Sequence, residues 1–305
     1  MIVILFRESV ELIIFMLFGF LLLKLGWIKK IHINGLSGLL TKLSLPCAIL
    51  MSCQMPFSWQ TAQVIGESAV ISLLFMIVTL LLALLMPKIF RIKADLKNIW
   101  VGCCTFSNIL FIGIPIIGSL YGHVGLIVLV TYNAFSNLFL FSFGIKLYSS
   151  VSKFEWRSFL LTPAIAASIL GFLLFFARIR IVSPISETLS DLGNMTAPLS
   201  MLITGALFAQ TDFQHLFKRL DLYEFCLTRL VILPLVLVPL LKFGIQNQII
   251  LGVMVIAAAM PAGAINTALA ELYSGQGRRA SEYVVSSTLL SMLTIPLVAW
   301  VSLFA

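Results

Sequence analysis

The sequence predicts an all-α integral membrane protein with ten transmembrane helices arranged as two inverted repeats of five helices. Three observations lead to this fold class. The 305 residues are 60% hydrophobic and only 10% charged, with a mean hydropathy of +1.09, whereas soluble domains are typically about one quarter charged. Long apolar runs recur along the chain, and the chain matches itself at an offset of about half its length. The composition excludes a soluble globular enzyme, a disordered chain and a coiled coil.

The transmembrane helices are located by the polar interruptions between apolar runs, because one helical span needs about 20 mostly apolar residues. The stretch 98–145 contains no Asp, Glu, Lys or Arg and divides naturally at Tyr121-Gly122-His123. Lys42 and Arg229 lie inside spans, where a charge reaches the interface by snorkelling or lies within the helix bundle. For Arg229, we expect snorkelling to the cytoplasm rather than attraction of anions. The predicted spans are residues 10–27, 34–53, 64–86, 97–121, 124–148, 158–177, 188–209, 224–243, 247–271 and 282–304.

The basic residues predict the orientation of these spans. All but four of the 20 Lys and Arg residues lie in or beside the loops that follow odd-numbered spans. Cytoplasmic loops carry this excess, so both termini are predicted to be extracytoplasmic and the protein to reside in the cell membrane. The net charge of +8 is therefore explained by the lipid bilayer, and no nucleic-acid partner is predicted. The four exceptions are Arg7, Arg178, Arg180 and Lys242.

An internal repeat divides the chain into residues 1–152 and 153–305. At an offset of 152 residues, the segment Gly19-Phe20-Leu21-Leu22 falls on Gly171-Phe172-Leu173-Leu174, and Leu50 falls on Leu202. Because five spans are an odd number, the second half enters the membrane from the opposite side. Inverted repeats recur in secondary transporters, which bind substrate near the midplane at the repeat interface. A generic helix bundle without a transport role remains the alternative. Two proline pairs and a tyrosine pair also match, namely Pro46 with Pro198, Pro87 with Pro239, and Tyr121 with Tyr273.

Spans 4 and 9 are predicted to be broken helices. Each carries proline and glycine near its middle, as NILFIGIPIIG from Asn108 and AAMPAGAINT from Ala258. An interior proline removes a backbone hydrogen bond and costs about 3 kcal/mol, so such a break persists in lipid only where protein or a hydrated cavity satisfies it. Half-helix N-termini then offer free N–H groups to a carboxylate; the alternative is a simple kink. The candidate substrate-binding residues in these spans are Asn108, Gly113, Pro115, Pro261, Asn266 and Thr267.

Three further amides lie inside spans. Asn133 and Asn137 are four residues apart and share one helix face, and Asn194 precedes Pro198 in span 7. Such amides either join helices or bind a carboxylate or Na⁺, and the sequence leaves both roles open.

Two carboxylates are candidates for coupling transport to H⁺ or Na⁺. Glu67 opens span 3, either as an interfacial group or as a cation site. Glu271 lies about 15 Å past Pro261 at helical rise, within reach of Arg278 or Arg279, in a structural or a gating role. No metal site, cofactor motif or catalytic cluster is predicted, and the five cysteines all lie in apolar runs, where we interpret them as packing residues.

Four motifs resemble those of one known family. They are N-x4-G-I-P from Asn108 to Pro115, AAMPAG in span 9 followed by Glu271-Leu-Tyr273, SSTLLSMLTIP over residues 286–296, and LSLP over residues 43–46, which contains Ser44 and Pro46. In these motifs, and in length and span order, the chain resembles the auxin efflux carrier family, which includes the plant PIN carriers. It lacks the long hydrophilic loop that plant members carry between spans 5 and 6.

The resemblance implies a fold and a set of site residues. Spans 1, 2, 6 and 7 would form a scaffold, spans 3–5 and 8–10 a moving transport bundle, and spans 4 and 9 would cross at their prolines. It also implies a homodimer through the scaffold, Asn108 at the substrate, and roles for Ser44 and Pro46 of the span 2 motif. The plant acid–base pair on span 3 is not carried over, because position 71 is Ile71.

The leading functional hypothesis is a secondary active or facilitative transporter, not an enzyme, that carries small organic anions such as malonate, malate or auxin-like acids by elevator-type alternating access. A membrane-embedded sensor or receptor with a transporter-like fold is the alternative. A membrane enzyme would need convergent His, Asp, Glu or Cys at mid-depth, which the sequence lacks.

Overall fold

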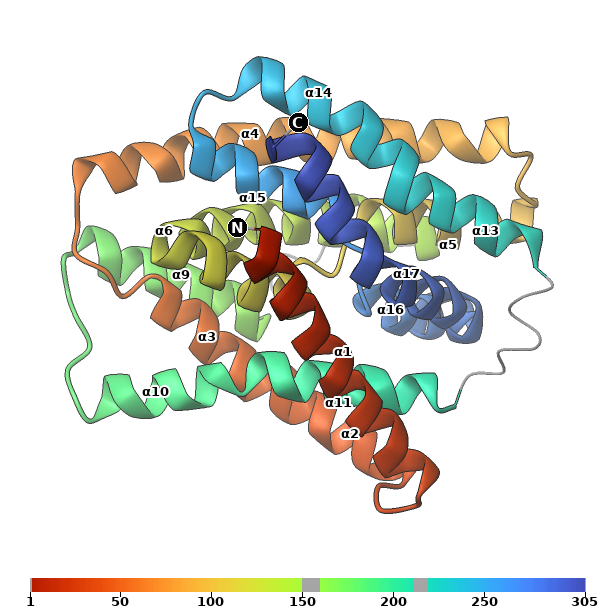
Figure 1. Cartoon of the computed structure of the whole chain (residues 1–305), viewed down its shortest axis with the longest axis horizontal. Helices are drawn as coiled ribbons and strands as arrows, with labels where there is room; N and C mark the ends of the chain where they lie inside the picture. The colour runs from red at the N-terminus through yellow and green to blue at the C-terminus, as the bar shows by residue number, and fades with distance from the viewer. Residues whose placement is uncertain (1, 150–159, 211–218, 305) are drawn as a thin grey trace.

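The computed structural model describes residues 2–149, 160–210 and 219–304, and the regular elements of this part of the chain are all helices (Figure 1). The all-α prediction is therefore confirmed for the described residues. Five helical stretches are long and apolar enough to cross a membrane, and two shorter apolar helices accompany them, which indicates a multi-pass membrane protein. The five stretches are Ile31–Ser52, Trp59–Ile89, Ile109–Tyr148, Leu220–Gly244 and Gly277–Ser302.

The first half of the chain contains every helix expected there. The predicted division at residues 121–123 is confirmed, because Gly122 interrupts α6 with a φ of 58°, a left-handed conformation that glycine adopts at little cost. The elements are α1 (Ile2–Lys24), α2 (Lys30–Leu39), η1 (Leu40–Ser44), α3 (Leu45–Ser52), α4 (Trp59–Ile89), α5 (Ala94–Thr105), α6 (Ile109–Phe139), η2 (Leu140–Gly144) and α7 (Ile145–Tyr148).

The second half is also helical at each expected span. The predicted boundary between the halves, at residues 152 and 153, lies outside the described residues. The elements are α9 (Pro163–Phe176), α10 (Ile185–Asn194), α11 (Thr196–Phe208), α13 (Leu220–Leu227), η3 (Thr228–Ile232), α14 (Leu233–Gly244), α15 (Gln248–Ala259), α16 (Ile265–Ser274) and α17 (Gly277–Phe304).

Two glycines that match at the half-length offset allow equivalent close helix contacts. A Cβ added to Gly19 of α1 would overlap the carbonyl of Leu202 in α11. A Cβ added to Gly171 of α9 would lie 2.9 Å from Cys53 Sγ and 3.8 Å from the Cα of Leu50 in α3. Leu50 and Leu202 are themselves a matched pair at the half-length offset. The glycine of each half therefore contacts the matching leucine of the other half. This symmetry supports the repeat, while the ten-span inverted arrangement remains a prediction.

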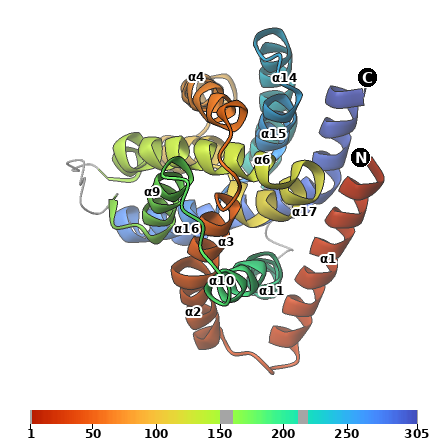
Figure 2. The same cartoon turned by 90° about the vertical axis from the view of Figure 1, so that its left-hand side faces the viewer.

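The helices form two groups. In group I, which comprises α1–α3, η1 and α9–α11, α1 packs along α11, and α3 packs against α9 and α10. In group II, which comprises α4–α7, α13–α17, η2 and η3, α4 packs on α5 and α6, and α15 packs on α6 and α17. Helices α2, α10 and α11 lie at the bottom of both views and α4 and α14 at the top (Figures 1 and 2).

Contacts between the groups involve mainly two group II helices, α6 and α17, of which α17 packs against α1 and α11. The group II helix α6 meets α1, α3, α9 and α11 of group I. Both views also show that α1 begins close to the end of α17 (Figures 1 and 2). The groups correspond to the spans expected for a scaffold and a transport bundle, and α6 carries one of the two predicted breaks.

Candidate substrate site at the helix crossing

The two broken spans meet at their breaks. Residues 106–108 separate α5 from α6, and residues 260–264 separate α15 from α16. Ser107 and Ala262 pair there as a short antiparallel bridge. Pro261 contributes to its own break because it has no N–H group to donate to a helix.

Backbone groups released by one break are satisfied by the other. The Asn108 N–H donates to Pro261 O at 2.9 Å, and the Gly263 N–H donates to Phe106 O at 2.9 Å. Gly263 permits this approach, since a Cβ there would lie 2.9 Å from the Ser107 carbonyl oxygen. Buried backbone groups in lipid require such partners, so each break depends on the other.

Asn266 of α16 stabilises the crossing through side-chain hydrogen bonds. Its Nδ2 donates to Phe106 O at 2.9 Å and to Gly263 O at 2.8 Å, and its Oδ1 accepts from the Tyr148 hydroxyl at 2.9 Å. The side chain is fully buried. Asn266 was predicted as a substrate ligand, but its amide is fully engaged with protein in this conformation.

A cavity of about 290 Å³ lies between the two helix groups at the crossing. Group I contributes residues from η1, α3 and the start of α9, and group II contributes both breaks and one face of α6. None of the lining residues is acidic, and one, Lys42, is basic. The lining residues are Thr41, Lys42, Leu45, Phe106, Ser107, Asn108, Ile109, Leu110, Phe111, Asn133, Ser136, Asn137, Leu140, Thr162, Pro163, Ala164, Gly263, Ala264 and Ile265.

Two helix N-termini open onto this cavity. Ile109, Leu110 and Phe111 of the first turn of α6 line it, as do Ala264 and Ile265 where α16 begins. The first N–H groups of a helix have no intrahelical acceptor and carry a partial positive charge. Two such ends facing one space make it favourable for an anion.

Side-chain donors add to this field. Asn108 is the N-cap of α6, yet its side chain makes no capping hydrogen bond. Asn137 Nδ2 donates to the Asn133 carbonyl oxygen at 2.9 Å and to Asn133 Oδ1 at 3.0 Å, which leaves the buried Asn133 Nδ2 without a partner. Three asparagines and one ammonium group therefore line the cavity without a carboxylate that would repel an anion, and the unpartnered Asn133 Nδ2 is buried in this conformation.

The prediction that span 4 breaks at Pro115 was wrong. The break lies at residues 106–108, and Pro115 continues within α6. The carbonyl released by Pro115 belongs to Phe111, four residues earlier, and it accepts a weak hydrogen bond of 3.5 Å from Ser200 Oγ of α11. Ser200 Oγ also donates to Ala197 O at 2.9 Å, so it shares its single proton and satisfies the Phe111 carbonyl only in part. The helix nevertheless continues through the proline.

Pro115 and Asn194 line a different cavity, of about 320 Å³, between α3, α6, α10 and α11. Besides Pro261 and Asn266, which belong to the crossing, four predicted residues line neither cavity. Gly113 packs within α6, where an added Cβ would lie 3.2 Å from Leu129 Cδ1. The remaining three are Ser44, which is buried in η1, Pro46, in the first turn of α3, and Thr267, which is half-buried in α16.

The predicted coupling carboxylates are exposed and lie outside the crossing cavity. Glu67 is on an exposed face of α4. Glu271 accepts a hydrogen bond of 2.9 Å from the Gly277 N–H at the start of α17. Its suggested pairing with Arg278 or Arg279 is not among the ion pairs of the described residues, where Arg278 pairs instead with Glu282 at 3.5 Å. In the described part of the chain, no cluster of three His, Cys, Asp or Glu residues could hold a metal ion.

The sequence did not identify two cationic features of this region. Lys42 was expected either at an interface or within the bundle, and it lines the crossing cavity between the two groups. Arg229 was expected to snorkel, but it is 1% exposed and lies inside group II. It belongs to the π-helical turn η3, and the ionisable side chains that it faces are Tyr132 and Cys104. A charge within an apolar run was the only sequence signal for either residue.

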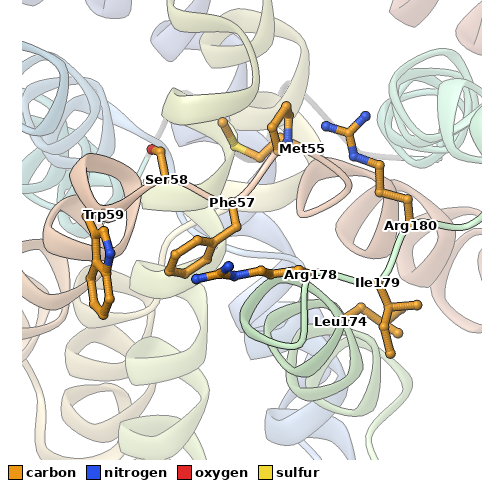
Figure 3. A pocket seen from close by; sticks show the side chains of 9 residues that line it. Met55, Phe57, Ser58, Trp59, Leu174, Arg178, Ile179 and Arg180 are labelled. Carbon is orange, nitrogen blue, oxygen red and sulfur yellow. The ribbon is translucent and has the colours of Figure 1, made fainter.

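A third cavity, of about 420 Å³, lies between the α3–α4 and α9–α10 connections, away from the crossing (Figure 3). The Arg178 guanidinium lies 4.6 Å from the centre of the Phe57 ring, and Arg178 has a left-handed φ of 60°. Arg180 extends away from that ring in Figure 3. No predicted site residue lines this cavity.

Comparison with protein families gives two matches to one family model, described as membrane transport protein, at residues 4–153 and 146–299. Each match covers about one half of the chain, in agreement with the internal repeat. Comparison with curated proteins gives no match. The family is one of transporters, which is consistent with the prediction that the chain is not an enzyme. Because the two matches together cover nearly the whole sequence, the chain belongs to the membrane transport protein family, the auxin efflux carrier family that its motifs resemble.

Proposed function

We propose that this protein transports small organic anions, such as malonate, malate or related carboxylates, by alternating access in which group II moves against group I. The observation that carries the proposal is the cavity between the groups, where two helix N-termini and three asparagines line a space without an acidic residue. Its volume of about 290 Å³ lies near the lower end of small-molecule sites, which span about 300–1,000 Å³. A small carboxylate fits this size and chemistry.

The expected affinity also suits a transporter. A partly buried helix N-terminus contributes up to ~2 kcal/mol to anion binding, and a hydrogen bond to a charged group contributes about 1.5–3 kcal/mol. Two helix ends with one or two such bonds give roughly 4–8 kcal/mol, or a Kd between about 1 mM and 1 μM. Binding of this strength permits release in each cycle.

The position of the cavity favours a mechanism in which group II moves relative to group I. Its walls come from both groups, and the crossing is held together within group II by the hydrogen bonds between residues 106–108 and 260–264. A rigid group II can therefore carry the donors with it while the group I wall changes. We further propose that the protein forms a homodimer through group I. Transport would be either coupled to H⁺ or Na⁺, which would then set its direction, or simply facilitated.

The test is counterflow in proteoliposomes loaded with unlabelled malonate, malate or succinate, with uptake of the same labelled anion. We expect saturable exchange of at least one dicarboxylate. Asn133→Ala removes the free Nδ2 at the cavity wall and should raise the half-saturating concentration about tenfold, the equivalent of one such bond. Gln63→Ala, which removes an exposed amide of α4 outside the cavity, is the matched control and should exchange like the parent.

Two results would contradict the proposal. Parent protein that neither binds nor exchanges any of these anions would refute the substrate class. Saturable binding without exchange would favour the sensor or receptor alternative, because a sensor needs the site but not the movement.

A further inference from the structure

Arg229 is a buried charge that has no counterion among the residues that the structure describes. It lies within Leu220–Gly244, one of the apolar stretches long enough to cross a membrane, and is 1% exposed. Its Nε and Nη1 have no hydrogen-bond partner. The ion pairs among the described residues join Arg219 to Asp221, and Glu282 to both Arg219 and Arg278, so none involves Arg229. Arginine does not lose its proton in proteins, and a buried unpaired charge is among the most destabilising features that a fold can contain.

The groups packed around Arg229 do not neutralise it. Cys104 of α5 and Tyr132 of α6 are the ionisable side chains that act on it, and both are uncharged in their ordinary forms. Phe225, one helical turn earlier, packs edge-on against Trp100 at 5.9 Å between ring centres, and the indole Nε1 of Trp100 is also buried without a partner. The surroundings are aromatic and neutral, so the field of the guanidinium extends beyond them with little screening.

Tyr132 connects Arg229 to the crossing. The hydroxyl of Tyr132 neighbours Ser107, which lines the crossing cavity and pairs with Ala262 in the bridge between the breaks. Asn133, the next residue in α6, lines the same cavity. Arg229 therefore lies behind the cavity wall, separated from it by Tyr132.

We infer that Arg229 is the fixed countercharge for the transported anion. Its guanidinium, behind Tyr132, raises the positive potential of the crossing cavity and offsets the charge of the anion while group II carries it through the membrane. The inference rests on the proposed function and adds a charge requirement to it. Arg229 and the cargo together would carry one positive charge when the site is empty, no net charge with a monoanion, and one negative charge with a dianion.

This role separates stability from transport. Replacement of Arg229 by Met removes an uncompensated buried charge and keeps an unbranched side chain of similar length, so the variant should unfold at a higher temperature than the parent. The same change should raise the half-saturating malonate concentration on the order of tenfold, the size of effect that one unit charge behind the cavity wall exerts in a protein interior. Replacing a residue that served only to pack the helices would not both raise the unfolding temperature and weaken transport.

The experiment compares four purified proteins: the parent, Arg229→Met, Arg229→Lys and Arg278→Met. Arg278 is the matched control, because its side chain is 80% exposed and lies outside the crossing cavity. Each protein is measured for thermal unfolding with and without malonate, for malonate counterflow, and for malonate-induced current on a supported membrane. We expect Arg229→Met to be more stable, to lose most malonate-induced stabilisation, and to show a different transient charge displacement in the step in which the loaded group II moves. The net charge per transported anion stays the same, because a fixed charge returns with group II in each cycle. Arg229→Lys keeps the charge and should keep malonate-induced stabilisation, and Arg278→Met should match the parent.

Distinct results would overturn this inference and the proposed function. If the parent exchanges malonate and Arg229→Met exchanges it with unchanged half-saturation and current, Arg229 is not the countercharge, although the protein is still an anion transporter. A lower unfolding temperature for Arg229→Met would show that the charge is compensated and would also reject the inference. If Arg229→Met does not fold, loss of malonate-induced stabilisation in folded Arg229→Lys rejects it instead. A parent without binding or exchange of malonate, malate or succinate would refute the proposed function itself.

Discussion

Replacement of Asn266 by alanine should destabilise the crossing of the two broken spans. The change removes three hydrogen bonds, to Phe106 O, to Gly263 O and from the Tyr148 hydroxyl, all between 2.8 and 2.9 Å. Side-chain hydrogen bonds inside membranes average about 0.6 kcal/mol, and in soluble proteins about 1 kcal/mol. Three of them give a loss of about 2–3 kcal/mol in the free energy of unfolding.

A double-mutant cycle isolates one of these bonds. Tyr148→Phe removes only the bond from the tyrosine hydroxyl to Asn266 Oδ1 and should cost about 0.6–1 kcal/mol. Because both variants remove that bond, the double variant should be less destabilised than the sum of the two single changes by a similar amount. Asn266→Asp should be worse than Asn266→Ala, since it places a carboxylate where Nδ2 donates to two carbonyl oxygens.

The assay is unfolding by SDS in mixed micelles, followed by tryptophan fluorescence, alongside malonate counterflow. Asn194→Ala is the matched control, because this amide is exposed and makes no hydrogen bond among the described residues. It should remain within ~0.5 kcal/mol of the parent, as exposed substitutions usually do. If Asn266→Ala also remains within that range, the crossing does not depend on this side chain and the reasoning fails.

Four other predictions concern topology, the site and coupling. Sidedness reporters fused at residue 153 and at the C-terminus should report opposite sides of the membrane, and equal sidedness would contradict the odd number of spans in each half. Asn108→Ala should weaken malonate-induced thermal stabilisation while the protein stays folded, because it removes donors at the cavity without altering the break; unchanged stabilisation would remove Asn108 from the site. Pro115→Ala should retain exchange, since the break lies elsewhere, and loss of exchange in a folded variant would show that this proline shapes the transport path. If uptake is driven by a pH gradient, Glu67→Gln or Glu271→Gln should lose that drive yet keep counterflow, and full pH-driven uptake in both variants would exclude both carboxylates from coupling.

The sequence by itself determined that the chain is a multi-pass helical membrane protein with a repeated half. Apolar runs of this length must enter lipid as helices, because only a helix satisfies its backbone within one segment. The matched pair Gly19 and Gly171 was visible in the sequence because close helix packing leaves little choice of side chain at these positions. The division at Gly122 was visible for a similar reason, since a left-handed φ in a long apolar run favours glycine.

The residues that form the break in span 4 were decided only by the tertiary structure. A proline marks where one hydrogen bond is missing, but a helix can continue past it, as α6 does at Pro115 with only a shared hydrogen bond from Ser200 to the Phe111 carbonyl. The chain breaks instead at residues 106–108, where the partners come from residues 260–264, more than 150 positions away. Local sequence contains no information about that pairing.

The environments of the charged residues were likewise decided by tertiary contacts. Lys42 and Arg229 both interrupt apolar runs, and the sequence allowed each to lie at an interface or within the bundle. Lys42 lines a cavity that needs residues from both groups, and Arg229 is enclosed by Cys104 and Tyr132 from two other helices. The free energy of a charge in a membrane protein depends on the groups packed around it, and those groups are brought together only when the halves of the chain fold against each other.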